Sequence, residues 1–487
     1  MIRKILPGAI LTVAVFAVVS LGGSIRAATA GNISPRVLAE TANGGGTEAL
    51  VVLKEQADLS PAANLHNKLE KRRYVVNTLQ DVAERTQRPI VSFLRRHKIR
   101  YHPFYIVNMI EVTGDRALML QLAARSDVDR IDANPYARTA LPIRTHADSS
   151  SRTDSGAHIN TVEWNVEQVH APEVWALGYK GKGLVVASAD TGVQWDHPAL
   201  KLHYRGWKRN KVNHNYNWHD AVANERVPFD PYGHGTFTAS EMVGDDGQGN
   251  QVGVAPGAKW IACRNMDANG TGSPARYTEC FEYLMAPYPY NHPKKGNPAL
   301  AADSINNSWI CPASEGCNWD TLLKIVDAVR AAGIFPAMAA GNSGSNCSTV
   351  DTPPAIYRSA VSVGALDSSN NIADFSSRGP VTVDNSNRLK PNLSAPGVNI
   401  RGAVPGNGYE SGWSGTSMAA PHLAGGVALL WEAKRSLDGD VSKTESIVTH
   451  SAQHLQTTED CGGTQGKIPN DTYGWGLLDL RKAVKAQ

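Results

Sequence analysis

Three short segments, far apart in the chain, carry an aspartate, a histidine and a serine in a pattern that suits nucleophilic catalysis. They read Ala189-Asp190-Thr191-Gly192-Val193, Gly233-His234-Gly235-Thr236 and Ser414-Gly415-Thr416-Ser417-Met418-Ala419-Ala420-Pro421-His422. A serine hydroxyl is a poor nucleophile at neutral pH and needs an adjacent base. Histidine can take its proton and return it to a leaving amine, and a carboxylate can hold the imidazole in the required tautomer. The pattern therefore predicts acyl transfer at Ser417, with His234 as base and Asp190 as its partner.

A fourth segment adds a group that could stabilise negative charge on the reacting carbonyl oxygen. Ala339-Ala340-Gly341-Asn342-Ser343-Gly344 has the pattern of a strand that ends in an asparagine, whose amide can donate a hydrogen bond. Ser417 opens a predicted helix, where unpaired backbone N–H groups also favour an oxyanion. The shorter motifs taken singly are more often structural than catalytic. The eight residues from Gly415 to His422 rarely recur by chance, so the four segments together favour catalysis.

The elements that must position these residues follow from the pattern after residue 160. Buried strands are expected over 184–189, 304–309 and 334–340, and a helix over 237–243. Between the last two strands, one helical face is apolar and ends at Gly333, with Leu322, Ile325, Val326 and Val329 along it. Such alternation predicts an α/β fold, a doubly wound and mostly parallel sheet with helices on both faces, over residues 161–487. Asp190 then lies at the carboxyl end of a strand, where these sheets place their active sites.

Residues 48–138 form a separate predicted unit, a small α+β domain. Strands are expected at 49–53, 105–112 and 128–131, helical patterning over 59–93, and a helix over 116–124. The run Lys71-Arg72-Arg73 could bind an anionic partner, although a solvated helix face is the favoured interpretation. Residues 31–47 indicate a linker, and the Ser-, Thr-, Arg- and His-rich segment 139–160 indicates an exposed processing connector.

The N-terminal segment predicts that the chain is exported from the cell. Arg3 and Lys4 precede an apolar stretch over 5–21, and Ala28-Thr29-Ala30 follows, which predicts a cleaved signal peptide over residues 1–30. An uncleaved membrane anchor is the less favoured alternative. The six cysteines (Cys263, Cys280, Cys311, Cys317, Cys347 and Cys461) predict three disulfides, with Cys311–Cys317 a guess on proximity. The net charge of +3 on 487 residues argues against nucleic acid as a partner. The sequence contains no C-x-x-C pair, so nothing in it resembles a set of zinc ligands.

The four motifs resemble those of the subtilisin-like serine peptidases. Two further segments resemble the bacillopeptidase F-like branch: Val254-Ala255-Pro256-Gly257-Ala258-Lys259-Trp260-Ile261 and Ile305-Asn306-Asn307-Ser308-Trp309. The resemblance covers about residues 169–480. It implies a doubly wound α/β fold, endopeptidase activity without a cofactor, and Asp190, His234, Asn342 and Ser417 as the active-site set. It also implies that the unit at 48–138 is an inhibitory propeptide and folding helper, whose tail around 133–140 lies in the substrate cleft. An independent binding domain is the alternative.

Three positions depart from the family pattern. The substrate-binding strand matches at Ser308 and Trp309, but Ile310 and Cys311 follow where the family usually has glycines. In the family such a glycine borders the pocket for the P1 side chain, so a narrowed or reshaped pocket is expected. The resemblance also implies Ala340 and Gly341 as substrate-binding residues. Ala199 occupies a position that often supplies a calcium-binding aspartate, which puts a structural calcium in doubt. Phe237 replaces a second histidine of many relatives, with no expected effect on the mechanism.

Two functions are compatible with these observations. The first is a secreted monomeric endopeptidase, made as a self-inhibited precursor, which acts on proteins and peptides without stable membrane association. The second is a secreted peptide-binding protein that keeps the fold without catalysis. The complete set of Asp190, His234 and Ser417 favours the first, because a non-catalytic relative usually lacks at least one member. A carboxyl peptidase with Glu in place of His is disfavoured by the motif around His234.

Overall fold

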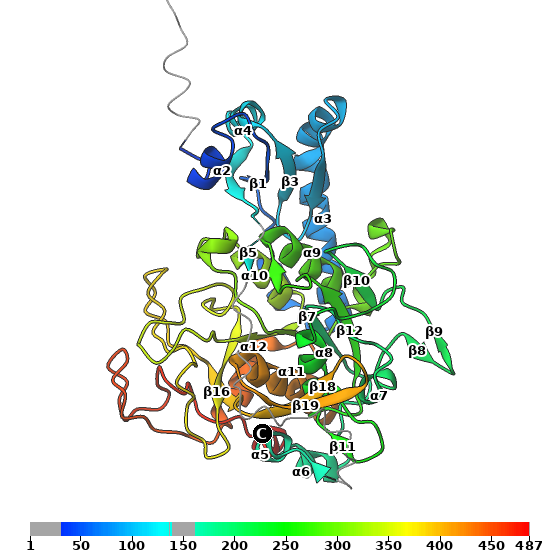
Figure 1. Cartoon of the computed structure of the whole chain (residues 1–487), viewed down its shortest axis with the longest axis vertical. Coiled ribbons are helices and arrows are strands. Elements are labelled where there is room, and N and C mark those ends of the chain that lie inside the picture. Colours follow the sequence, from blue (N-terminus) through cyan, green and yellow to red (C-terminus); the bar gives the residue numbers. More distant parts are fainter. Residues whose placement is uncertain (1–30, 136, 139–160, 487) are drawn as a thin grey trace, which may run out of the picture.

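The computed structural model describes residues 31–135, 137–138 and 161–486. A small N-terminal unit, blue to cyan in Figure 1, lies against a larger unit that contains the rest of the chain. The predicted signal peptide and the predicted processing connector over 139–160 lie outside the described residues.

A parallel sheet forms the centre of the larger unit. Its seven strands follow the order β10-β12-β7-β14-β15-β16-β17, and every neighbouring pair is parallel. The strands are β7 (Val185–Asp190), β10 (Trp218–Asp220), β12 (Lys259–Arg264), β14 (Ser304–Asn307), β15 (Phe335–Ala339), β16 (Val361–Leu366) and β17 (Leu393–Pro396). The chain order reverses between β7 and β14. In such sheets the binding crevice opens at the carboxyl ends of the strands that flank this switch point.

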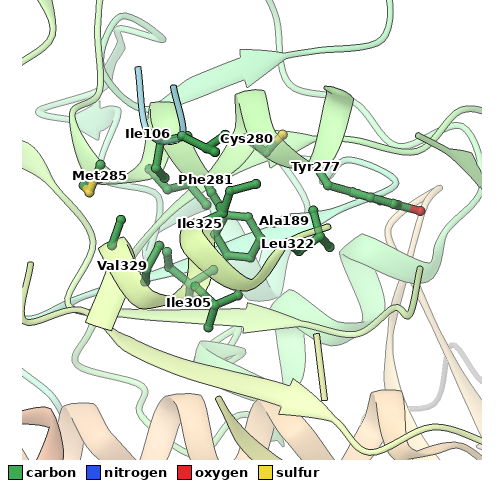
Figure 2. Packing of buried hydrophobic residues seen from close by; sticks show 14 of the residues in the cluster. Ile106, Ala189, Tyr277, Cys280, Phe281, Met285, Ile305, Leu322, Ile325 and Val329 are labelled. Atoms are coloured by element: carbon green, nitrogen blue, oxygen red, sulfur yellow. The ribbon is translucent and has the colours of Figure 1, made fainter. Parts of the chain in front are cut away.

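Helices cover both faces of this sheet, which confirms the doubly wound α/β fold. On one face, α8 (His234–Val243) and α11 (Thr416–Ala433) pack over apolar side chains that include Val186 and Ala337. On the other face, α9 (Pro274–Met285) and α10 (Leu323–Ala331) pack over Ile305. Figure 2 shows Phe281, Ile325 and Val329 of these helices beside Ile305.

The remaining elements of the larger unit are short. They are the helices α5 (Trp164–Gln168), α6 (Ala171–Ala176), α7 (Pro198–Lys201), α12 (Val441–His450) and α13 (Leu480–Lys485), the single turns η2 (Pro293–Lys295), η3 (Pro298–Leu300), η4 (Ala313–Glu315) and η5 (Arg435–Leu437), and the paired strands β6 (Thr161–Val162) with β11 (Asn250–Gln251), β8 (Trp207–Lys208) with β9 (Lys211–Val212), and β18 (Ile400–Val404) with β19 (Gly408–Trp413). Three disulfides are present, Cys263–Cys280, Cys311–Cys317 and Cys347–Cys461, so the expectation of three bridges is confirmed. Among the described helices, none is both long enough and apolar enough to span a membrane.

The N-terminal unit is an antiparallel sheet covered by a long helix. The sheet order is β2-β3-β1-β4. The elements are α2 (Pro35–Glu40), β1 (Thr47–Leu53), η1 (Ser60–Asn64), α3 (Lys68–Arg96), β2 (Tyr101–Phe104), β3 (Met109–Gly114), α4 (Arg116–Ala123) and β4 (Val128–Ala133). The predicted α+β architecture is therefore confirmed.

Three sequence-based expectations for this unit are wrong. Residues 31–47 are not a linker, because α2 forms there and both Ile33 and Val37 are buried in the core of the unit. The long helix begins at Lys68 rather than near residue 59, because the side chain of Asn67 caps it by accepting from the N–H groups of residues 69 and 70. The strand predicted over 105–112 begins only at Met109, because residues 105–108 form the turn between β2 and β3. The N–H groups of Tyr105 and Ile106 donate to the carboxylate of Glu282 in the larger unit instead of a neighbouring strand.

The two units share a hydrophobic core. Ile106 of the N-terminal unit belongs to the same buried cluster as Phe281 and Met285 of α9, and Figure 2 shows the three side chains together. A fourth expectation also fails here. Arg72, expected on a solvated face, is only 4% exposed and pairs with Asp303 of the larger unit. Its partner lies 231 residues further along the chain, so helical periodicity alone could not have indicated it.

Candidate active site

Asp190 and His234 form a buried hydrogen-bonded pair at the switch point of the sheet. Asp190 is the last residue of β7, His234 is the first residue of α8, and the His234 Nδ1 to Asp190 Oδ1 distance is 2.7 Å. Both side chains are inaccessible to solvent. The Asp190 carboxylate also accepts from the Thr191 N–H and the Thr238 hydroxyl. These bonds hold the carboxylate so that the imidazole presents Nε2 away from it.

The glycine after the histidine allows this close contact between helix and strand. A Cβ at Gly235 would lie 2.1 Å from the Gly192 carbonyl oxygen and 3.0 Å from the Asp190 Cβ. Any larger residue would therefore push α8 away from β7 and lengthen the bond between Asp190 and His234. Glycine at position 235, which follows His234 and contacts Asp190, therefore has a physical reason.

Asp230 is a positioning residue that the sequence analysis missed. Its buried carboxylate accepts hydrogen bonds from the Thr191 hydroxyl, from the Gly233 N–H, and from both the N–H and the hydroxyl of Thr236. It therefore ties the end of β7 to the start of α8. The available signal was an aspartate four residues before His234, in a loop that leads into a helix.

Ser417 lies in the first turn of α11, which packs against α8. The two N-terminal turns meet through a shared cluster in which Phe237 stacks on Trp413 at 4.6 Å and Met418 packs beside them. The Ser417 hydroxyl donates to the Ser308 carbonyl at 3.0 Å, and the Ser308 hydroxyl donates to the Ser417 carbonyl at 2.8 Å. Within the described part of the chain, His234 Nε2 makes no hydrogen bond. In this structure the Ser417 hydroxyl is therefore hydrogen-bonded to a backbone carbonyl and not to the imidazole.

The amide of Asn342 is oriented by its neighbour Thr416. Asn342 Oδ1 accepts from the Thr416 N–H at 2.9 Å and from the Thr416 hydroxyl at 2.8 Å. The Thr416 hydroxyl in turn accepts from the Gly341 N–H. Because the oxygen of the amide faces two donors, the NH₂ group of Asn342 is the part left to face the pocket beside Ser417.

A small pocket adjoins Ser417, lined by Ser308, Trp309, Ile310, Ala339, Gly341, Asn342, Ser343, Thr416 and Ser417. Four of the five expected substrate-binding residues are therefore together. The fifth, Ala340, does not line this pocket; it is buried in the hydrophobic cluster that also contains Trp309. Ala339 takes that place. Trp309 is rigid, since its ring stacks on Tyr277 at 3.9 Å and its indole N–H donates to the Ala189 carbonyl.

Two further buried titratable groups lie close to the site. Glu241, seven residues after His234 on α8, is fully buried, and neither of its carboxylate oxygens has a hydrogen-bond partner among the described residues. Burial, together with the nearby charge of Asp190, raises the pKa of Glu241 well above its usual value. His422 lies on α11, contacting the Met418 carbonyl and the Asn165 amide. Burial lowers the pKa of His422 to about 4, so it is neutral.

The region around Ala199 does not fit a calcium ion. Ala199 is buried and offers no carboxylate, and its carbonyl already accepts from the Asp245 N–H. The carboxylate of Asp246 accepts from the Tyr409 hydroxyl. A protein cation, Arg401, stacks over the Tyr409 ring and donates to the side chains of Asn250 and Glu163. The donor set that a calcium ion requires is therefore not formed here.

The sequence of this chain is similar to those of known proteins. Residues 181–476, more than half of the chain, match the model of the Subtilase family. The chain is 39% identical to Bacillopeptidase F of Bacillus subtilis (strain 168) over 438 residues, which cover 86% of this chain but only 29% of that protein. It is 33% identical to Subtilisin E of the same strain, over 56% of this chain and 62% of that protein. It is 28% identical to Alkaline protease of Alkalihalobacillus alcalophilus, over 74% and 77%. The chain therefore belongs to the subtilase family, whose members are serine endopeptidases.

Proposed function

We propose that this chain is a secreted serine endopeptidase that hydrolyses peptide bonds in proteins through an acyl-enzyme at Ser417, and that it is made as a self-inhibited precursor. The observation that carries the proposal is the buried pair of Asp190 and His234, with Ser417 and the oriented amide of Asn342 at the neighbouring helix start. The alternative, a non-catalytic peptide-binding protein, has no need of a buried and hydrogen-bonded carboxylate–imidazole pair.

In the proposed reaction, His234 Nε2 takes the hydroxyl proton while Ser417 Oγ bonds to the peptide carbonyl carbon. Asp190 keeps the imidazole in the tautomer that leaves Nε2 free to accept. The oxyanion receives hydrogen bonds from the Asn342 amide and from the backbone N–H of Ser417, the second residue of α11, where helical N–H groups lack intrahelical acceptors. The C–N bond then breaks as His234 returns the proton to the amine, and water hydrolyses the resulting ester.

The precursor role of the N-terminal unit rests on two observations. The match to Bacillopeptidase F covers 86% of the chain, and residues 181–487 make up less than two thirds of it, so the likeness extends into the N-terminal unit. In addition, β5 (Ala137–Arg138) pairs antiparallel with β13 (Thr271–Gly272) of the larger unit. Gly272 adjoins Tyr277, which stacks on the pocket residue Trp309. This pairing beside a neighbour of Trp309 supports the proposal that the end of the N-terminal unit acts as a product-like inhibitor.

Active-site titration with a serine-directed phosphonofluoridate tests the enzymatic proposal. We expect stoichiometric labelling of Ser417 in the wild type and none in Ser417→Ala. Absence of labelling in folded wild-type protein would favour the peptide-binding alternative. N-terminal sequencing of the secreted wild type and Ser417→Ala then tests the precursor proposal. We expect a new N-terminus between Arg138 and Asn160 only in the wild type, if processing is autocatalytic.

The pocket residues support a restricted P1 preference. Ile310 lies at a position where a glycine would leave more room, and Trp309 is held by its stack on Tyr277. We therefore expect small P1 side chains to be favoured over large aromatic ones. Cleavage-site profiling with a peptide library measures this. Ile310→Gly should accept a wider range of P1 side chains than the wild type. A preference of the wild type for Phe or Tyr at P1 would contradict the expectation.

A further inference from the structure

The first turns of α3 reach into the larger unit with three basic side chains. Figure 1 shows α3 running from the N-terminal unit down beside the larger one. Lys68 Nζ lies 2.8 Å from both Asp303 Oδ1 and Asp438 Oδ1. Arg72 donates to Asp303 Oδ1 at 2.9 Å and to the carbonyl of residue 302 at 2.6 Å. Lys71 donates to the carbonyl of residue 439.

Asp303 depends on these cations. The described donors to its carboxylate are Lys68, Arg72 and the backbone N–H of Val185. Burial raises the pKa of Asp303, but the charges of Arg72 and Lys68, together with the hydrogen bonds from Lys68 and the Val185 N–H, hold the pKa below its usual value. A buried carboxylate deprived of its cations is strongly destabilising. The two cations on α3 are therefore what allows a charged group at this position.

Asp303 also lies where three central strands begin. Its backbone N–H donates to the Val185 carbonyl at 2.7 Å, and its carbonyl accepts from the Phe335 N–H at 2.9 Å. Its side chain accepts from the Val185 N–H at 2.8 Å. It therefore holds the first residues of β7 and β15 on either side of β14, and β7 is the strand that ends in Asp190.

We propose that Asp303 is the docking site of the larger unit for helix α3, and that Arg72 and Lys68 bind it to stabilise the central strands β7, β14 and β15. This inference rests on the precursor role proposed above and names the contact through which the N-terminal unit assists folding. A parallel sheet forms slowly because its contacts are non-local, so a partner that fixes the start of three strands shortens the search. The contact is separate from the apolar contacts of Ile106 and from the tail near the pocket.

Hydrogen–deuterium exchange on the full-length Ser417→Ala chain, which cannot use its own nucleophile, tests the proposal. The variants are Arg72→Met and Lys68→Met, and Arg73→Met is the matched control because Arg73 is the exposed neighbour on the same helix. We expect Arg72→Met to raise the exchange rate about tenfold or more at the first two turns of α3 and at the amides of Val185 and Phe335. Lys68→Met should have a smaller effect, because the Lys68 side chain is 23% exposed. Arg73→Met should leave these amides unchanged.

A double variant that also removes the Asp303 charge keeps the test decisive if Arg72→Met does not fold. If Arg72→Met fails to fold because the Asp303 charge is uncompensated, Arg72→Met combined with Asp303→Asn should recover folded protein. The proposal is overturned if Arg72→Met and Arg73→Met show the same exchange at Val185 and Phe335. It is equally overturned if Arg72→Met fails to fold and the double variant yields no more folded protein than Arg72→Met.

These outcomes are distinguishable from failure of the enzymatic proposal. Exchange is measured in a chain without the nucleophile, so it reports docking whether or not the wild type is a peptidase. Failure of the wild type to label at Ser417 would remove the peptidase assignment and leave the docking result intact. Normal labelling, with no difference between Arg72→Met and Arg73→Met, would remove the docking inference alone.

Discussion

Asn342→Asp separates the hydrogen-bond donor of Asn342 from its structural role. The two hydrogen bonds that Asn342 accepts from Thr416, at 2.9 and 2.8 Å, can be kept by a carboxylate of the same shape. The donor to the oxyanion is lost. Removal of one oxyanion donor in the subtilisin family costs about 10²–10³ in kcat, or about 2.7–4 kcal/mol of transition-state stabilisation. Because the new carboxylate also repels the oxyanion, we expect Asn342→Asp to lose at least this much.

The assay is steady-state hydrolysis of a chromogenic peptide, with kcat and KM determined separately. We expect kcat to fall and KM to change little, because the donor acts on charge that develops only in the transition state. The matched control is Asn346→Asp, the same chemical change at an exposed position on the same loop. Asn342→Ala should lose activity and also thermal stability, since Thr416 then loses its acceptor. A kcat within about threefold of wild type for Asn342→Asp, at unchanged folding, would refute the role of Asn342 as a donor.

Three further predictions concern stability, measured in the Ser417→Ala background to prevent self-cleavage. Glu241→Gln should be more stable than its parent at pH 8 but not near pH 4. Above about pH 4.5 the Glu241 carboxyl ionises in the unfolded chain, whereas its raised pKa keeps it protonated in the folded chain, and this difference destabilises the parent. Melting temperatures of the two proteins measure this, and a difference that does not vary with pH would contradict it. Between pH 7 and pH 4 the free energy of unfolding of the parent should fall by about 3 kcal/mol relative to that of His422→Gln. The reason is that His422 is protonated below about pH 6.5 in the unfolded chain but only below about pH 4 in the folded chain. Denaturant unfolding at both pH values measures this, and parallel pH profiles of the two proteins would contradict it. Replacing Cys347 and Cys461 by Ala should lower the free energy of unfolding by about 5 kcal/mol, and replacing Cys311 and Cys317 by Ala should lower it by about 2 kcal/mol. A disulfide restricts the unfolded chain, and the entropy that it removes grows with the sequence separation, which is 114 residues for the first pair and 6 for the second. Calorimetry that finds the two losses equal or reversed would contradict this reasoning.

Prediction from sequence worked best where a pattern is local. The strand that ends in Asp190, the strand that precedes Asn342, the helix whose first turn holds Ser417 and the apolar face of α10 were all expected within a few residues of their observed positions. Strand and helix periods are set by side chains that are neighbours in sequence, so they can be recognised without the fold.

Prediction failed where a group depends on a distant partner. Arg72 has the sequence context of a solvated helix residue and is buried only because Asp303 lies beside it. Tyr105 and Ile106, expected in a strand, lie in the turn between β2 and β3, where their N–H groups donate to Glu282 of the larger unit. Ala340 was expected at the pocket and is instead packed in the buried cluster that includes Trp309, while its neighbour Ala339 lines the pocket. Glu241 and Asp230 were overlooked because their burial is a property of the assembled core.

The sequence by itself determined the chemical groups and the order in which they meet the sheet. Alternating strands and helices specify a parallel sheet, and such a sheet collects the carboxyl ends of its strands at one edge, which is where the motifs place Asp190 and Asn342. Only the tertiary structure decided which charges are buried and which way each polar side chain points, including the Ser417 hydroxyl toward Ser308 and the Asn342 amide toward the pocket. The reason is that burial and hydrogen bonding depend on groups brought together from far along the chain, whereas helix and strand patterns depend on neighbours.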